Sequence, residues 1–195
     1  MLQLPITTLK NFIKGATMLK IFITDLAAYT QGFLIGEWIT LPKEKEELIE
    51  DINRILGTGE RICEDYPHEE FFTTDYEWSD VEIFPIGEYD NLDELNQKLN
   101  LIEEVDESDH IKLKFLLDNN LVSSLEEAIE KIDDVIYHQD STMRDIAEEY
   151  IYTCYDLDTL PKIIAHHIDY DGIARDLEID GSFYQEGLDI FEYLG

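Results

Sequence analysis

One long run of carboxylates, residues 62–109, constrains this chain more than any other feature. Aspartate and glutamate recur throughout it, and Lys98 is its single lysine or arginine. Runs of like charge of this length are usual in disordered tails. Here, however, aromatic and aliphatic side chains are interspersed with the acids, among them Tyr66, Phe72 and Trp78. Because such side chains stabilise a fold by leaving water, the sequence predicts a folded scaffold that holds carboxylates in a fixed array.

The charge of the whole chain predicts an extended shape. The formal net charge is -31, with 14 lysines and arginines against 45 aspartates and glutamates, and self-repulsion is worst in a compact sphere. Duplex DNA carries one charge per about 1.7 Å of axis, so 31 charges match about 53 Å, or about 15 base pairs. A compact chain of 195 residues has a radius of gyration of only about 16 Å. A chain whose charge imitates DNA should therefore be longer than one sphere.

Composition limits the class of protein. At 44% hydrophobic residues the chain can form real hydrophobic cores. The two cysteines, Cys63 and Cys154, are too few for a disulfide framework, and they are expected to be reduced packing residues of a cytoplasmic protein. Apolar runs stay well short of the ~20 residues of a membrane span, so a soluble protein is expected. The sign of the charge disfavours binding to nucleic acid or to a membrane, and it favours a basic protein surface as partner.

The first residues, 1–17, differ from the rest because they contain two lysines and no acid. Three interpretations stay open for them: a poorly ordered extension, a short accessory helix, or sequence upstream of a true start at Met18. A fourth and weaker interpretation is a membrane-binding helix, since two lysines provide little electrostatic attraction to a membrane.

Alternating apolar and polar side chains open the folded part of the chain. They predict a strand over residues 19–24 and a second strand over 33–41. Apolar residues at helical spacing then predict a helix over 43–56, which Gly57 and Gly59 end. Together these elements predict a first small α/β unit.

Capping signals predict helices in the middle third. Asn91 with Glu94 resembles a capping pair, and a further helix is expected over residues 109–118. Ser124 with Glu127 is expected to form a capping box for the next helix. The acidic residues of these helices are expected to point outward.

The last third is expected to mix helices with a final strand. Ser141 is predicted to cap a helix whose inner face includes Tyr150 and Cys154. Pro161 opens another helix, and an alternating pattern over residues 189–194 predicts a strand.

The predicted fold class is α+β, an elongated chain of three small domains. An N-terminal α/β domain covers residues 19–80, a central acidic helical domain 81–135, and a C-terminal α/β domain 136–195. Residues 1–18 precede them as an extension.

Short motifs at both ends of the chain resemble the ArdA family of antirestriction proteins. At the start they read LKIFITDL from Leu19, YTQG from Tyr29 and GEW from Gly36; at the end they read YD from Tyr170, ARDL from Ala174 and GSF from Gly181. Their order and spacing, together with the acidic middle, make the resemblance specific. It covers about residues 19–195 and leaves residues 1–17 outside.

The resemblance implies an elongated, curved protein of three small domains that forms a homodimer and imitates bent duplex DNA. Such proteins are carried by mobile genetic elements and occupy the DNA-binding groove of type I restriction-modification enzymes. Neither catalysis nor a cofactor is implied, and no catalytic or metal-binding residue is predicted. The apolar edge of the C-terminal unit is the expected dimer contact.

Surface carboxylates, acting as a distributed set, are the expected partner contacts. They are Glu64, Asp65, Glu69, Glu70, Asp75, Glu77, Asp80, Glu82, Glu103, Glu104, Asp106, Glu107, Glu126, Glu127, Glu130, Asp133, Asp134, Asp145, Glu148 and Glu149. Arginine and lysine pair with carboxylate as they do with phosphate, so affinity should fall steeply with salt. Neutralising one carboxylate should have a small effect, and neutralising a cluster a large one.

Other functions stay open. Solubility or halophilic adaptation would explain charged helix faces without any partner. An ion-binding protein is another alternative, because Asp176, Glu178 and Asp180 match the first positions of a calcium loop; the twelfth position, however, is Gly187. A carboxylate-based hydrolase is the third, although so many acids make any single pair uninformative.

Overall fold

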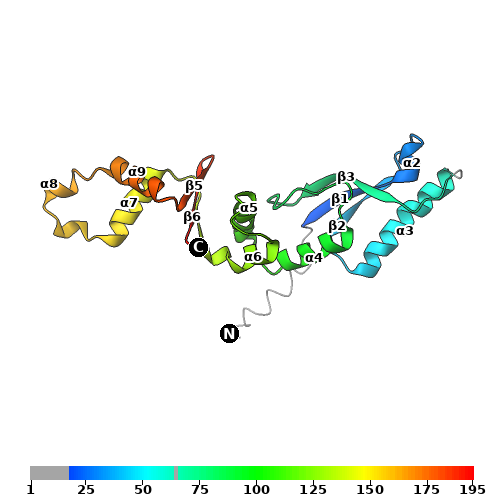
Figure 1. Ribbon diagram of the computed structural model, residues 1–195, viewed down its shortest axis with the longest axis horizontal. Coiled ribbons are helices and arrows are strands. Elements are labelled where there is room, and N and C mark those ends of the chain that lie inside the picture. The colour runs from blue at the N-terminus through cyan, green and yellow to red at the C-terminus, as the bar shows by residue number, and fades with distance from the viewer. Residues whose placement is uncertain (1–17, 64–65) are drawn as a thin grey trace, which may run out of the picture. The chain divides into compact units, whose positions relative to one another are not determined.

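The computed structural model describes residues 18–63 and 66–195, which form two compact units that divide between Lys114 and Phe115 (Figure 1). Within these residues the class is mixed α/β, with eight α-helices and two small antiparallel sheets. The expected mixture of helices and strands is confirmed. The division into three domains stays a prediction, and the expectations for residues 1–17 lie outside the described residues.

The sheet of the N-terminal unit has β1 (Leu19–Asp25) at its centre. The strand β2 (Gly36–Leu41) pairs with it on one side and β3 (Phe71–Trp78) on the other, both antiparallel. Alternate side chains of β1, starting with Leu19, are fully buried, which confirms the period-two prediction. Part of the acidic stretch is therefore the third strand of this sheet.

The second strand is shorter than predicted. Instead of running over 33–41 it begins at Gly36, and Phe33 and Leu34 are exposed. The chain first forms an unpredicted short helix, α2 (Leu26–Thr30), which Asp25 caps through its carboxylate. The turn that leaves this helix occupies the residues expected to start the strand.

The long helix α3 (Lys45–Ile62) packs against this sheet (Figure 1). The prediction that it ends at Gly57 and Gly59 is wrong, because both glycines lie inside it. A Cβ atom on Gly59 would overlap the carboxylate of Asp25 and lie 2.7 Å from Nδ1 of His68. Glycine at this position therefore permits a close approach of other side chains and does not stop the helix.

Three α-helices of the middle third agree with prediction. They are α4 (Leu92–Ile102), α5 (His110–Asp118) and α6 (Leu125–Glu130), with the 3-10 turns η1 (Glu107–Asp109) and η2 (Ile132–Asp134). The side chain of Asn91 accepts hydrogen bonds from two backbone N–H groups, which confirms the predicted cap. Ser124 also caps as predicted, but Glu127 bonds to Ser123 instead of closing the capping box.

The C-terminal unit combines a second sheet with a helix pair. Its elements are the strands β4 (Val135–His138), β5 (Phe183–Glu186) and β6 (Asp189–Tyr193), the helices α7 (Met143–Cys154), α8 (Lys162–Ala165) and α9 (Tyr170–Asp180), and η3 (Leu157–Thr159). The predicted final strand is confirmed as β6, which lies between β4 and β5. On this sheet the ring of Phe115 stacks on Phe191 at 4.4 Å.

Two predictions about α7 are wrong. Its N-cap is Thr142 instead of Ser141, because the Thr142 hydroxyl and the Asp145 carboxylate form a reciprocal capping box. Tyr150 and Cys154 are exposed, so Cys154 is not a packing residue. Only the first half of α7 contributes to the buried cluster shared with α9. No helix in residues 18–63 and 66–195 has both the length and the apolar character of a membrane span.

Candidate functional site

The predicted contact carboxylates lie at the surface wherever the structure describes them. Glu103, Glu127, Asp134 and Glu148 are half-buried, and the remaining described ones are exposed. Glu64 and Asp65 lie outside the described residues. Side chains that contact a partner must be accessible to it, and the described carboxylates meet this requirement.

In the N-terminal unit, β3 and its flanks carry one group of these carboxylates. Asp75 and Glu77 are two residues apart on β3, so they share one face of the sheet. Three of the group have partners. The Oε2 atom of Glu77 lies 3.8 Å from Nζ of Lys20, Glu82 accepts a 2.9 Å hydrogen bond from the Tyr76 hydroxyl, and Asp75 accepts a 2.8 Å hydrogen bond from the backbone N–H of Tyr76. The others in this group are Glu69, Glu70 and Asp80, which are exposed.

A second group follows α4, and we call it the acidic turn: Glu103, Glu104, Asp106 and Glu107. Glu103 ends α4 as its C-cap, and Glu107 begins η1. Within the described part of the chain, no side chain of the acidic turn forms a hydrogen bond or an ion pair. Four carboxylates with no partner among residues 18–63 and 66–195 therefore lie within five residues of sequence.

In the C-terminal unit, several of the predicted carboxylates are already engaged. Glu148 lies 3.1 Å from Nε of Arg144, and Asp134 lies 3.7 Å from Nζ of Lys131. Hydrogen bonds from the backbone and hydroxyl of Ser123 lower the pKa of Glu127. The hydroxyl and backbone N–H of Thr142 likewise lower the pKa of Asp145. These groups support the local fold, whereas Glu130, Asp133 and Glu149 are exposed carboxylates without such a role in the described residues.

Sequence reasoning missed a buried ion pair at the end of β1. Asp25 and the side chain of His68 are almost completely inaccessible to solvent, and Oδ2 of Asp25 lies 2.5 Å from Nδ1 of His68. The other ring nitrogen, Nε2, lies 2.8 Å from the carbonyl oxygen of Cys63. That oxygen can only accept, so Nε2 carries a hydrogen. No local pattern could reveal a pair 43 residues apart.

The surroundings of His68 favour its charged form. Burial lowers the pKa of His68, but the hydrogen bond to the Cys63 carbonyl and the carboxylate of Asp25 together outweigh it, and the pKa is raised. The pair fixes the segment that leads into Glu69 and Glu70, two of the predicted contacts. It is therefore structural support for part of the acidic surface.

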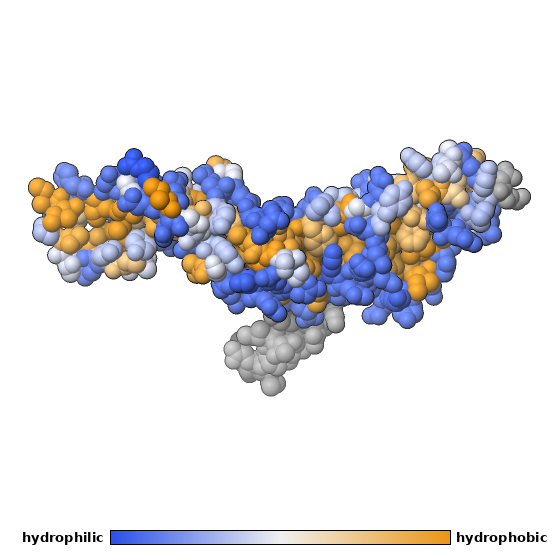
Figure 2. Space-filling model, in the orientation of Figure 1, coloured by the Kyte–Doolittle hydropathy of each residue, from blue (hydrophilic) through white to orange (hydrophobic). Residues whose placement is uncertain are grey.

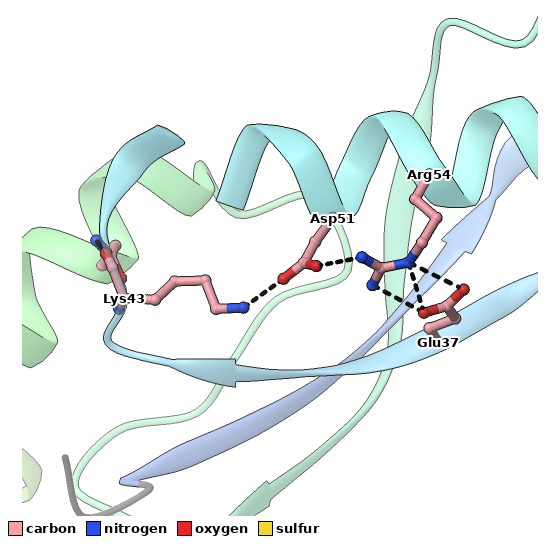
Figure 3. A network of polar contacts seen from close by, with 5 residues as sticks. Glu37, Lys43, Asp51 and Arg54 are labelled. Atoms are coloured by element: carbon pink, nitrogen blue, oxygen red, sulfur yellow. Dashed lines mark hydrogen bonds and ion pairs between the residues drawn. The ribbon is translucent and has the colours of Figure 1, made fainter. Parts of the chain in front are cut away.

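A polar network balances the charge between β2 and α3 (Figure 3). Arg54 lies 2.7 Å from Asp51 and 2.9 Å from Glu37, and Lys43 pairs with the same Asp51. Burial raises the pKa of Asp51, but the hydrogen bonds from Lys43 and Arg54 outweigh this effect, and the pKa is lowered. Because cations neutralise the acids here, this part of the unit differs from the acidic turn.

The structure does not support the alternative of a calcium loop at Asp176, Glu178 and Asp180. Asp176 and Glu178 lie within helix α9, and Gly181 ends that helix in the left-handed conformation. These carboxylates therefore do not surround one point from an irregular loop, as calcium ligands do. Across residues 18–63 and 66–195, no cluster of three or more histidine, cysteine or acidic side chains is arranged to hold a metal ion.

Comparison with known families agrees with the motifs at the two ends of the chain. The family model described as "Antirestriction protein (ArdA)" matches residues 21–189, from β1 of the first sheet to β6 of the second. No curated protein matches the chain. Since the family match spans most of the sequence, this chain belongs to the ArdA family of antirestriction proteins.

Proposed function

We propose that this protein inhibits a type I restriction-modification enzyme by occupying its DNA-binding groove, with surface carboxylates in the places of DNA phosphates. Membership of the antirestriction family supports inhibition of restriction. The observation that carries the DNA-like mode is the acidic turn, whose four carboxylates have no partner in the described residues. Such groups are available to arginine and lysine side chains that otherwise neutralise phosphates.

The energetics favour a distributed site. An exposed ion pair contributes only about 0.2–1 kcal/mol, whereas a nanomolar complex requires about 12 kcal/mol. Many carboxylates must therefore act together, and none is expected to dominate. The predicted set, spread over both units, fits this requirement.

A homodimer through the C-terminal unit belongs to the same proposal. Ile163 of α8 is 73% exposed, and Ile164 beside it is also exposed. Figure 2 shows hydrophobic side chains, in orange, gathered over α8. Replacement of both isoleucines with aspartate should convert the dimer to a monomer in sedimentation equilibrium, and an unchanged dimer would place the contact elsewhere.

Salt dependence tests the proposal. Binding of this protein to a purified type I enzyme should weaken steeply between about 50 and about 200 mM salt, as protein–phosphate contacts do. Inhibition that is insensitive to salt over this range would contradict it. If a single carboxylate change abolished inhibition in a folded protein, a catalytic or ion-binding role would replace the proposal.

A matched pair of variants tests where the contacts lie. The triple change Glu104→Gln, Asp106→Asn, Glu107→Gln should weaken binding and reduce the slope of log K against log salt by about one per lost contact. The control changes Asp176→Asn, Glu178→Gln and Asp180→Asn, which remove the same charge from exposed acids outside the predicted set. Equal effects from both triples would show that only net charge matters.

A further inference from the structure

The face of the N-terminal sheet that points away from α3 carries aromatic side chains. Phe22 of β1 pairs in register with Trp38 of β2, and cross-strand partners share a face. Their rings meet edge to face with centroids 5.4 Å apart. Ile21 and Ile23, which flank Phe22, are fully buried on the opposite side, and Trp38 remains 47% exposed.

A second aromatic group lies on the same face. Thr24, two residues after Phe22, pairs in register with Phe72 of β3. Phe72 contacts Tyr29 at 5.2 Å and Tyr89 at 6.0 Å between ring centroids. Phe72 itself is buried, whereas Tyr29 is 52% and Tyr89 72% exposed. We call the five residues Phe22, Trp38, Phe72, Tyr29 and Tyr89 the outer aromatic face.

The Phe22 ring of this face is held in place. A Cβ atom on Gly36 would lie 2.7 Å from Cε1 of Phe22, so the Phe22 ring lies against the bare backbone of that glycine. Thr24, between the two aromatic groups, is fully buried, and its hydroxyl lies 2.8 Å from that of Thr74. The Trp38 ring packs against this fixed Phe22 ring, and a ring that is already restrained loses less conformational entropy when a partner binds.

Carboxylates flank the outer aromatic face. In the sheet register Asp75 lies opposite Phe22, so it is next to the first aromatic pair; Glu77, one row away, is paired with Lys20. Glu88 and Asp90, on either side of Tyr89, are exposed. Aromatic faces attract cations, arginine stacks on them most often, and carboxylates hold its guanidinium by paired hydrogen bonds. The local charge therefore fits an arginine-bearing surface.

We propose that the outer aromatic face binds arginine side chains of the partner enzyme, stacked on the exposed rings of Trp38, Tyr29 and Tyr89 beside the neighbouring carboxylates. This inference rests on the proposed function, because the partner is the same enzyme. Tryptophan and tyrosine are the residues most often found to dominate binding energy at interfaces. Contacts with rings release few ions, so this part of the affinity persists at high salt, unlike that of the carboxylates.

Binding measured at several salt concentrations tests this assignment. Trp38→Thr and Tyr89→Ser should each raise the Kd for the purified enzyme about tenfold, as loss of an aromatic anchor does. Neither should change the slope of log K against log salt. Trp38→Phe keeps a ring and should retain most of the affinity. Tyr152→Ser is the control, since Tyr152 is 65% exposed but lies in the other unit.

The outcomes separate this inference from the proposed function. If the wild-type protein binds with strong salt dependence and the acidic-turn triple weakens it, while Trp38→Thr and Tyr89→Ser bind like wild type, only the inference fails. If the wild-type protein does not bind the enzyme, the proposed function itself fails. Loss of self-association in a folded Trp38→Thr protein would assign the face to a second copy of this chain, and would overturn the assignment to arginine of the enzyme.

Discussion

Two glycines in helix α3 provide a sensitive test of the buried pair between Asp25 and His68. A Cβ atom on Gly57 would meet nothing within 4 Å. A Cβ atom on Gly59 would overlap the Asp25 carboxylate and lie 2.7 Å from Nδ1 of His68. The substitutions Gly57→Ala and Gly59→Ala are therefore chemically identical, on one helix, and differ only in what surrounds them.

The expected stabilities differ in sign. Alanine in a helix interior is about 1 kcal/mol more favourable than glycine, so Gly57→Ala should raise the free energy of unfolding by about that amount. Gly59→Ala has the same advantage of alanine over glycine in a helix, but its methyl group has to displace a buried ion pair, whose disruption costs about 3–5 kcal/mol. A net loss of about 2–4 kcal/mol is expected, so the two variants should differ by about 3–5 kcal/mol.

Urea unfolding followed by tryptophan fluorescence measures this difference. The 2 tryptophans of the chain, Trp38 and Trp78, both lie in the N-terminal unit, so the signal reports on the unit that contains the pair. With a urea dependence of about 1–3 kcal/mol per M, the unfolding midpoints should differ by about 2 M. If Gly59→Ala proved as stable as Gly57→Ala, the close packing of Asp25 and His68 against the helix would be refuted.

Further substitutions test other parts of the fold, by the same urea assay in the N-terminal unit and by circular dichroism in the C-terminal unit. Asp51→Asn leaves Lys43 and Arg54 without their shared carboxylate, which is 15% exposed, and should lower the free energy of unfolding by about 1–3 kcal/mol. Asp93→Asn removes an ion pair whose carboxylate is 46% exposed, and should change the free energy of unfolding by less than about 1 kcal/mol. Thr142→Ala should lose about 1 kcal/mol in far-UV circular dichroism melts of the C-terminal unit, whereas Ser141→Ala should lose far less, and equal losses would contradict the observed cap. The pKa of His68 is raised in the folded state, so protonated His68 stabilises the fold. This contribution to the free energy of unfolding is complete below the pKa of His68 in the unfolded chain, about 6.5, and is lost as the pH rises through the pKa in the folded protein. His68→Gln should remove this pH dependence.

Local patterns predicted the elements that depend on a few neighbouring residues. The alternation of β1, the Asn91 cap and the final strand are all readable from the sequence, because each uses contacts within a strand or one helical turn. The Thr142 cap was also readable, since Asp145 follows it at capping-box spacing. The choice of Ser141 as the cap was an error of one residue in a signal that was present.

Features set by distant contacts could not be predicted. Gly59 resembles a helix stop until Asp25 is placed beside it, and nothing in the sequence pairs Asp25 with His68. The apolar stripe of α7 continues to Cys154, but only its first half joins the buried cluster with α9, and the end of the stripe is exposed. Amphipathic spacing shows which side chains share a helix face; the position at which a neighbouring helix packs decides which of them are buried.

The candidate site was predictable in kind but not in detail. Sequence alone indicated that the acids would lie at the surface, and the described ones do. It could not separate carboxylates engaged within the fold, such as Glu127 and Asp145, from those of the acidic turn. It also gave no sign of the outer aromatic face, because that surface depends on the register of three strands.

Competition with duplex DNA is the most direct test of whether this protein binds in place of DNA. A purified type I restriction-modification enzyme would be titrated with this protein at several concentrations of a labelled duplex that carries its recognition site. If the carboxylates stand where phosphates bind, the apparent inhibition constant should rise in proportion to duplex concentration, and no complex should contain both ligands. A ternary complex of enzyme, duplex and this protein, or inhibition that saturating duplex does not relieve, would contradict the claim that this protein binds in place of DNA.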